Sequence, residues 1–427
     1  MRKNAFYAQS GGVTAVINAS AAAVIETCRQ HPDRIGTLYA GRNGILGALR
    51  EELIDTSLES DESIAALKHT PGGAFGSCRH KLKDIDTHLA EYERIIEVFR
   101  AHDIGYFFYN GGGDSSDTTL KMSQVAEKMG YPLTCVGIPK TVDNDLPLTD
   151  CSPGFGSVAK YIATSVMEAT LDIKSMCNSS TRIFVMEVMG RHAGWIAAAA
   201  GLAQSEQAEL PDGAVGHAPQ VILFPEVAFD EAAFLEKVQA SVDRDGFCTV
   251  VVSEGVQNAD GEFLAKSGLK DVFGHTQLGG VAPLIANLIK DRLGHRYHWA
   301  VADYLQRSAR HIVSATDLEH AIAVGRHAVE LALEGKNASM AIIVRESDEP
   351  YHWHVGDAPL SEIANVEKFM PDNFISSDGF GITAEAKRYL KPLIKGEAPP
   401  PFKDGLPSYV TLRNELVAKK LPNSFDI

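Results

Sequence analysis

The stretch IGYFFYNGGGDSSDTTLKM, residues 104–122, decides the fold. An apolar run ends in three glycines, and a carboxylate, Asp114, begins the polar segment that follows. Apolar runs without polar alternation are typical of strands buried on both faces of a parallel sheet. Glycines after such a strand let a phosphate approach the backbone, and the start of a helix offers N–H groups to bind it. Asp114 is unexpected there, because its charge repels the phosphates of a nucleotide.

Strand and helix patterns alternate along the rest of the chain. Residues 156–169 have the apolar spacing of a helix, and a capping-box pattern at 316–319 predicts another helix that Gly335 would end. Further apolar runs lie at 5–8, 133–137, 183–188, 221–224, 248–252 and 341–344. This alternation predicts an α/β protein with mainly parallel sheets. Because the units outnumber what one compact sheet usually holds, we expect two lobes.

Composition argues against several classes of function. The net charge of −15 disfavours nucleic acid or an anionic membrane as main partner. The six cysteines are scattered without a C-x-x-C pair, which disfavours a disulfide scaffold or a zinc site. The first residues lack the apolar region of a signal peptide, and no apolar run approaches the roughly 18 residues that cross a bilayer. We therefore expect a cytoplasmic protein with neither nucleic acid nor membrane as partner.

Two glycine-bearing loops after strands are suited to phosphate. In the first, Gly11 and Gly12 would let a phosphate reach a helix start, although a plain strand-to-helix turn has the same pattern. In the second, Asp114 and Ser115 either cap the next helix, or Asp114 belongs to a magnesium-linked phosphate site. The second loop matches neither G-x-x-x-x-G-K-[ST] nor G-x-G-x-x-G, so it predicts neither a P-loop nor a dinucleotide site.

A third loop, GIPKTVDND at 137–145, places two carboxylates close to a lysine. Asp143 and Asp145 are two residues apart, so in extended chain they face the same way. Lys140 and Thr141 stand just upstream. A base beside a cation is what phosphoryl transfer to a hydroxyl requires, because one takes the proton and the other stabilises the charge.

Charged residues also flank the later apolar runs. The candidates are Arg182, Arg191 and Glu254 beside these runs, and a cationic patch of Arg307, Arg310 and His311. Arg191, in a tight turn after a strand, is well placed to bind a phosphate bidentately. Glu254 is suited to accept hydrogen bonds from a sugar. For each charge the alternative is a surface salt bridge.

Taken in order, these motifs resemble those of the phosphofructokinase family. The matching pieces are SGG (10–12), GGGDS (111–115), PKTVDND (139–145), MGR (189–191), PE (225–226), SEG (253–255) and LQR (305–307). They span the chain from residue 9 to about 310. Three segments more narrowly resemble the branch that uses pyrophosphate rather than ATP. These are QSGGVTAVIN (9–18), QRSARH (306–311) and GITAEAKRYLKPL (381–393).

The resemblance implies two similar three-layer α/β/α lobes with mainly parallel sheets and an active site in the cleft between them. Residues 1–154 plus about 306–365 would form a phosphoryl-donor lobe. Residues 155–305 plus about 366–427 would form a sugar-phosphate lobe and a C-terminal wrap. A homodimer or homotetramer is also implied, since Arg182 would reach the active site of a neighbouring subunit.

The implied reaction is reversible, Mg²⁺-dependent transfer of a phosphoryl group from pyrophosphate to the 1-hydroxyl of fructose 6-phosphate, giving fructose 1,6-bisphosphate and phosphate. The catalytic set would be Asp143 as proton acceptor, Lys140, Thr141 and Arg191. Diphosphate would be bound by Gly12, Arg79, Asp114 and Lys140, and Mg²⁺ by Asp114 and Asp145. The sugar phosphate would contact Thr141, Asp143, Arg182, Met189, Gly190, Arg191, Glu254, Tyr304 and Arg307.

Two alternatives remain open, and a departure from the family pattern motivates the second. Where the family usually has an aspartate that serves the metal, this chain has Gly113. The first alternative is an ATP-dependent 6-phosphofructokinase, against which Asp114 argues because its carboxylate would crowd and repel an α-phosphate. The second is a catalytically silent sugar-phosphate-binding subunit, against which the retained Asp143, Asp145 and Lys140 argue.

Overall fold

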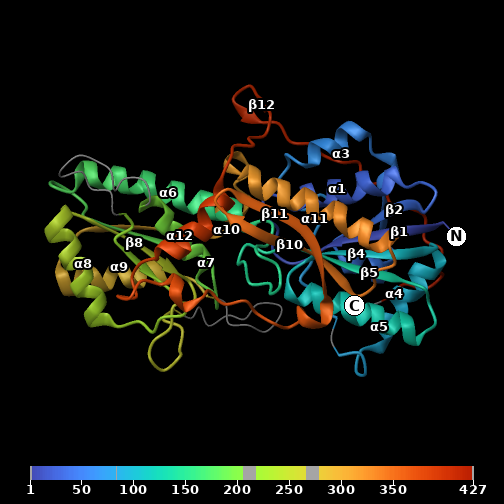
Figure 1. Cartoon of the computed structure of the whole chain (residues 1–427), viewed down its shortest axis with the longest axis horizontal. Helices are drawn as coiled ribbons and strands as arrows, with labels where there is room; N and C mark the ends of the chain where they lie inside the picture. The colour runs from blue at the N-terminus through green and yellow to red at the C-terminus, as the bar shows by residue number, and fades with distance from the viewer. Residues whose placement is uncertain (1, 83, 205–217, 266–277, 426–427) are drawn as a thin grey trace.

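The computed structural model describes residues 2–82, 84–204, 218–265 and 278–425, which two main β-sheets organise (Figure 1). The larger sheet has seven strands, in the order β11-β10-β5-β4-β1-β2-β3. Their bounds are β1 Lys3–Gln9, β2 Ile35–Gly41, β3 Leu53–Asp55, β4 Ile104–Gly111, β5 Thr134–Pro139, β10 Ser339–Asp348 and β11 Tyr351–Pro359. The smaller sheet has four, in the order β7-β8-β6-β9. Their bounds are β6 Ile183–Val188, β7 Val221–Leu223, β8 Cys248–Ser253 and β9 Tyr297–Val301.

Both sheets are mainly parallel, as the apolar runs predict. Every residue of β4 is buried, which fits a strand covered on both faces. All pairings within the smaller sheet are parallel. In the larger sheet the two edge strands, β3 and β11, pair antiparallel with their neighbours. The sequence-based description missed β2, β3, β9 and β11. β3 is only three residues long, and the other three contain partly or fully exposed positions rather than unbroken buried apolar runs.

Helices cover both faces of each sheet, giving two three-layer lobes (Figure 1). On the larger sheet, α1 (Ile17–Gln30) and α11 (Ala315–Leu333) pack on one face. The other face carries α2 (Ile45–Arg50), α4 (Leu89–Ala101) and α5 (Gly113–Lys128). On the smaller sheet, α6 (Phe155–Met176) and α7 (Trp195–Ala200) lie opposite α8 (Glu231–Asp245) and α9 (Val281–Leu293). The remaining elements are α3 (Asp61–Leu67), α10 (Asp303–Ser308), α12 (Ala384–Leu390) and the hairpin of β12 (Phe402–Lys403) and β13 (Leu406–Pro407).

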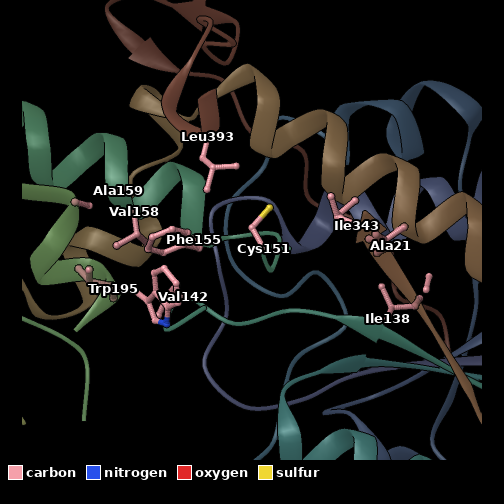
Figure 2. Packing of buried hydrophobic residues seen from close by; sticks show 14 of the residues in the cluster. Ala21, Ile138, Val142, Cys151, Phe155, Val158, Ala159, Trp195, Ile343 and Leu393 are labelled. Atoms are coloured by element: carbon pink, nitrogen blue, oxygen red, sulfur yellow. The ribbon is translucent and has the colours of Figure 1, made fainter. Parts of the chain in front are cut away.

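One apolar core runs from one lobe into the other (Figure 2). It includes Ile138 of β5 in the larger sheet and Trp195 of α7 on the smaller one. Phe155, at the start of α6, packs edge-on against Trp195 with ring centroids 6.3 Å apart. The two lobes are therefore joined by packing as well as by the chain, and the loops between them are held in place.

The last residues of the chain pack on the lobe of the larger sheet. Arg94 of α4 donates to the carbonyl of Asn423, and the buried Glu51 accepts from the backbone N–H of Lys420. The sequence-based division places this segment with the other lobe, and the division as a whole remains a prediction.

None of the helices among the described residues is long and apolar enough to span a membrane.

Candidate active site

A pocket of about 370 Å³ lies where loops from the two sheets meet. The larger sheet contributes the loops that follow β1, β4 and β5, and the smaller sheet those that follow β6 and β8. Crevices outside the carboxyl ends of parallel strands are the usual binding sites of α/β sheets. The pocket contains most of the predicted site residues. These are Gly12, Arg79, Asp114, Lys140, Thr141, Asp143, Asp145, Met189, Arg191, Glu254 and Arg307.

The two glycines of the first loop allow cationic side chains to approach the backbone. A Cβ on Gly12 would lie 2.4 Å from Arg307 Nη1 and 4.0 Å from Arg79 Nη2. Gly11 has a φ of +70°, and a Cβ there would lie 3.4 Å from Lys140 Nζ. Lys140 Nζ donates to the carbonyl oxygen of Gly12 at 2.8 Å. A lysine and two arginines therefore gather around one stretch of backbone, which is an arrangement suited to a polyanion.

Burial modifies the charge of Lys140. Its side chain is only 6% exposed, and this burial lowers its pKa to about 8, although Asp145 and Asp143 act in the opposite direction. Arg307 and Arg79 lower the same pKa further by repulsion. Binding of an anion among these three cations would relieve that repulsion.

Asp143 and Asp145 both line the pocket, with Asn144 between them. Asn144 is fully buried and has a φ of +54°, a left-handed conformation that asparagine tolerates better than most residues. Thr141 Oγ1 accepts from the backbone N–H of Asp143 at 3.0 Å. Burial raises the pKa of Asp143 to about 7; the charges of Asp145 and Glu254 act in the same direction, whereas Lys140 opposes them. A carboxyl group with a near-neutral pKa is suited to act as a general base.

Asp114 lies in the first turn of α5 and forms an ion pair with Lys81 at 2.5 Å. The N-cap of α5 is Gly112, so neither Asp114 nor Ser115 caps the helix with its side chain. The hydroxyl of Ser115 instead contacts that of Ser10 in the first loop. A Cβ on Gly113 would meet no atom within 4 Å, so lack of space does not explain the glycine.

The smaller sheet contributes Met189, Arg191 and Glu254 to the pocket. Gly190 is not a lining residue, but it shapes the turn that presents its two neighbours. Its φ is +129°, and a Cβ there would lie 2.7 Å from the carbonyl oxygen of Ala193. The carbonyl oxygen of Gly190 accepts from Ser253 Oγ at 2.5 Å, which ties the turn after β6 to the end of β8.

Four of the cationic or aromatic candidates lie outside the pocket, and one of them, His311, is exposed at the surface. Arg182 is exposed at the start of β6 and donates to the carbonyl of Cys177. Tyr304 is 59% exposed and stacks on Arg307, with the guanidinium carbon 3.7 Å from the ring centroid. The interpretation of Arg310 as part of a surface cationic patch is wrong. Arg310 is fully buried and donates to the carbonyls of Lys68 and Ala398, because it joins chain segments rather than facing solvent.

Sequence reasoning missed His80, His192 and Glu367, which also line the pocket. His192 Nδ1 lies 3.1 Å from Glu367 Oε1, across 175 residues of sequence. His192 directly follows the MGR motif, and this position could have indicated that it belongs to the site. Glu367 stands in no recognisable motif, and only the folded chain brings it to the site.

The carboxylates fit a magnesium ion that is shared with a phosphate ligand. Asp145 Oδ1 is buried, and among the described residues it has no hydrogen-bond partner. Within the same residues, no group of three or more His, Cys, Asp or Glu could hold a metal by itself. Mg²⁺ usually takes one or two carboxylates and completes its coordination with water and substrate phosphates.

The chain belongs to the phosphofructokinase family, whose model matches residues 4–332. It is 67% identical over 425 residues to the pyrophosphate–fructose 6-phosphate 1-phosphotransferase of Methylococcus capsulatus (strain Bath), covering 100% of this chain and 99% of that protein. The solved pyrophosphate-dependent phosphofructokinases of Marinobacter aquaeolei and Nitrosospira multiformis each cover 100% of both chains. Their TM-scores are 0.89 and 0.91, with identities of 62% and 59%.

Proposed function

We propose that this pocket reversibly transfers a phosphoryl group from diphosphate to the 1-hydroxyl of fructose 6-phosphate, giving fructose 1,6-bisphosphate and phosphate. The observation that carries the proposal is the convergence of Lys140, Arg79 and Arg307 on the Gly12 loop, with Asp143 beside them. Full-length relatives named for the same reaction support it. The same relatives favour diphosphate over ATP as donor and an active enzyme over a silent subunit.

Asp143 is the general base for the acceptor hydroxyl. Its pKa of about 7 lets it be ionised before the reaction and take a proton during it. Lys140, held at the carbonyl of Gly12, and Arg191 stabilise the charge on the transferring group. Thr141 contacts the same phosphoryl group. Phosphoryl transfer needs little more from a protein than such positioning and charge stabilisation.

Diphosphate binds at Gly12, Arg79 and Lys140. Asp145 and Asp114 would hold Mg²⁺, which when bound neutralises charge on the diphosphate oxygens. Asp114 differs from the sequence-based expectation in one respect. Its carboxylate is paired with Lys81, so it is less repulsive to phosphate than an isolated aspartate.

Fructose 6-phosphate binds on the side of the smaller sheet, at Met189, Gly190, Arg191 and Glu254. Arg307, oriented by its stacking on Tyr304, holds the 6-phosphate. Arg182 serves the site of a neighbouring subunit, which accounts for its exposed position outside the pocket of its own chain.

The active unit is a homodimer or homotetramer. Trp299, Val301, Tyr304 and Leu305 are 38–65% exposed within a stretch of seven residues, which is unusual for apolar side chains so close together. The stretch begins in β9, which is an edge strand of the smaller sheet and pairs with the strand that begins just after Arg182. A second copy seated there would cover these side chains and bring its own Arg182 close.

Replacement of Asp143 tests the proposed reaction. Asp143→Asn keeps the size of the side chain and removes the base, so turnover with fructose 6-phosphate and diphosphate should fall about 10²–10⁴-fold. Affinity for fructose 6-phosphate, measured by calorimetry, should change much less. Asp260→Asn, at an exposed aspartate, is the matched control. Near-normal turnover in Asp143→Asn would overturn the assignment of the base.

A further inference from the structure

A segment beyond the family match contacts the loop that carries the proposed base. The family model ends at residue 332, whereas Lys368 and Tyr389 lie in the chain that follows β11. Both side chains reach residues 144–150, the part of the chain that includes Asp145 and follows directly after Asp143.

Lys368 holds this loop at four points. Its backbone N–H donates to the carbonyl of Asp145 at 2.7 Å. Its ammonium donates to Asn144 Oδ1 at 3.3 Å and to the carbonyls of Thr149 and Asp150 at 3.1 and 2.9 Å. Three donors on one ammonium thus meet three acceptors on one loop, which matches the hydrogen-bonding capacity of lysine.

The position of Lys368 is itself fixed by the core between the lobes. Trp195 Nε1 donates to the carbonyl of Lys368 at 3.2 Å, and the ammonium lies 5.4 Å from the centroid of the Trp195 ring. Trp195 is 3% exposed and packs against Phe155 in the shared core. The lysine therefore connects the loop of the larger sheet to a rigid part of the other lobe.

Asn144 is the other end of this connection. Its Oδ1 accepts from Lys368 Nζ and from the backbone N–H of Ser152, and its Nδ2 donates to the hydroxyl of Tyr389 at 3.0 Å. A buried asparagine at positive φ is stable only when its surroundings satisfy its side chain. The left-handed turn between Asp143 and Asp145 thus depends on groups from the C-terminal segment.

We propose that Lys368 is a positioning residue for the reaction, holding residues 144–150 so that Asp143 and Asp145 both face the pocket. The proposal rests on the proposed function for the role of these carboxylates. Lys368 itself does not line the pocket, so its effect on the reaction is exerted through the loop.

Replacement by methionine keeps the length of the side chain and removes the ammonium. Since a misplacement of about 1 Å far from the chemistry can cost about 10²-fold, Lys368→Met should lower kcat by about that factor. The KM for fructose 6-phosphate should change by less than about threefold, because Met189, Gly190, Arg191 and Glu254, which bind most of the sugar, follow strands of the smaller sheet. Lys403→Met, at an exposed lysine of the β12–β13 hairpin, is the matched control.

Two further measurements separate positioning from a general loss of stability. Hydrogen–deuterium exchange should be faster in Lys368→Met for peptides covering 143–152, including the amide of Ser152, and unchanged in the helices of the smaller lobe. In Lys368→Ala, added propylamine should restore part of kcat by supplying the missing ammonium, whereas propanol should not.

The outcomes are distinct. Slow turnover with near-normal KM, faster exchange in the loop and amine rescue support the proposal. Wild-type kcat and unchanged loop exchange in Lys368→Met overturn it, as does a loss of kcat that follows global unfolding without amine rescue. If the unsubstituted protein transfers nothing from diphosphate, the proposed function fails. Hydrogen–deuterium exchange of residues 143–152 in Lys368→Met then tests the positioning role alone, and unchanged exchange overturns that role.

Discussion

At the scale of single residues, the surroundings of Gly12 show why the first loop needs a glycine. Arg307 comes from the far part of the chain and approaches Gly12 so closely that a methyl group would lie 2.4 Å from its Nη1. The glycines of this loop suit phosphate, but from the sequence alone a plain strand-to-helix turn is the alternative. The structure favours the former, since the guanidinium of Arg307 occupies the space that a Cβ would take.

Substitution of Gly12 should therefore affect binding rather than folding. In Gly12→Ala the flexible guanidinium of Arg307 would move away, at little cost to the melting temperature. Loss of one charge-assisted hydrogen bond from Arg307 to the 6-phosphate costs about 1.5–3 kcal/mol, so the KM for fructose 6-phosphate should rise roughly 10–100-fold. Gly113→Ala, where a Cβ meets no atom within 4 Å, should change KM far less. Equal effects of the two substitutions would contradict this account of Arg307.

The two perturbed groups of the pocket predict a bell-shaped dependence of kcat/KM on pH. Asp143 must be ionised to act as a base, so activity should fall as the pH drops through its pKa of about 7. Lys140 must be protonated to bind diphosphate, so activity should also fall as the pH rises through its pKa of about 8.

A substitution distinguishes Asp143 from the phosphate groups of the substrates, which titrate near pH 6. Glu254 raises the pKa of Asp143, so Glu254→Gln should move the acid limb to lower pH, while the titration of the substrates stays the same. An acid limb that does not move would assign that limb to the substrates and contradict the assignment to Asp143.

At the scale of elements, unbroken apolar strands and their loops were predictable, whereas short or partly exposed strands and long-range contacts were not. The residues of β4 are consecutive in the sequence, and so are those of the loop after β5. Each set therefore stays together however the rest of the chain folds. The start of α11 was predicted two residues late, because Ser314 rather than Thr316 caps the helix by accepting from the N–H of Asp317. Glu367 and Lys368 reach the site only through tertiary packing, which no local pattern encodes.

The C-terminal segment should stabilise the lobe on which it packs. Glu51 has a fully buried side chain, and its carboxylate is hydrogen-bonded to His102 and to the backbone N–H groups of Lys420 and Leu421. Deleting residues 418–427 leaves this carboxylate with fewer donors, so the free energy of unfolding should fall by about 1–3 kcal/mol. Denaturant unfolding measures this fall. Leu406→Ala, on the exposed hairpin, should change stability by no more than about 0.5 kcal/mol. An unchanged stability of the deletion variant would contradict the assigned role.

At the scale of the whole molecule, the edges of the two sheets differ. The larger sheet ends in antiparallel edge strands, and the C-terminal segment returns to its lobe. The smaller sheet ends at β9, which exposes Trp299 and Val301. Of the two lobes, the smaller one is therefore where we expect a second copy of the chain to bind.

Charges placed on this edge should separate the subunits. Trp299→Glu combined with Leu305→Glu would bury two carboxylates in the proposed interface, so sedimentation should show a monomer where the unsubstituted chain is a dimer or tetramer. Activity at low fructose 6-phosphate should fall when the subunits separate, because each site would lose the neighbouring Arg182. Leu406→Glu, which is 72% exposed on the hairpin, is the control and should leave the mass unchanged. A variant that keeps the oligomer mass would place the interface elsewhere.

The pocket is expected to use diphosphate as phosphoryl donor and fructose 6-phosphate as acceptor. A coupled assay for fructose 1,6-bisphosphate, with Mg²⁺ and fructose 6-phosphate and with either diphosphate or ATP at equal concentration, tests it most directly. The kcat/KM should be at least about 100-fold higher with diphosphate than with ATP. An equal or higher value with ATP, or no product with either donor, would contradict it.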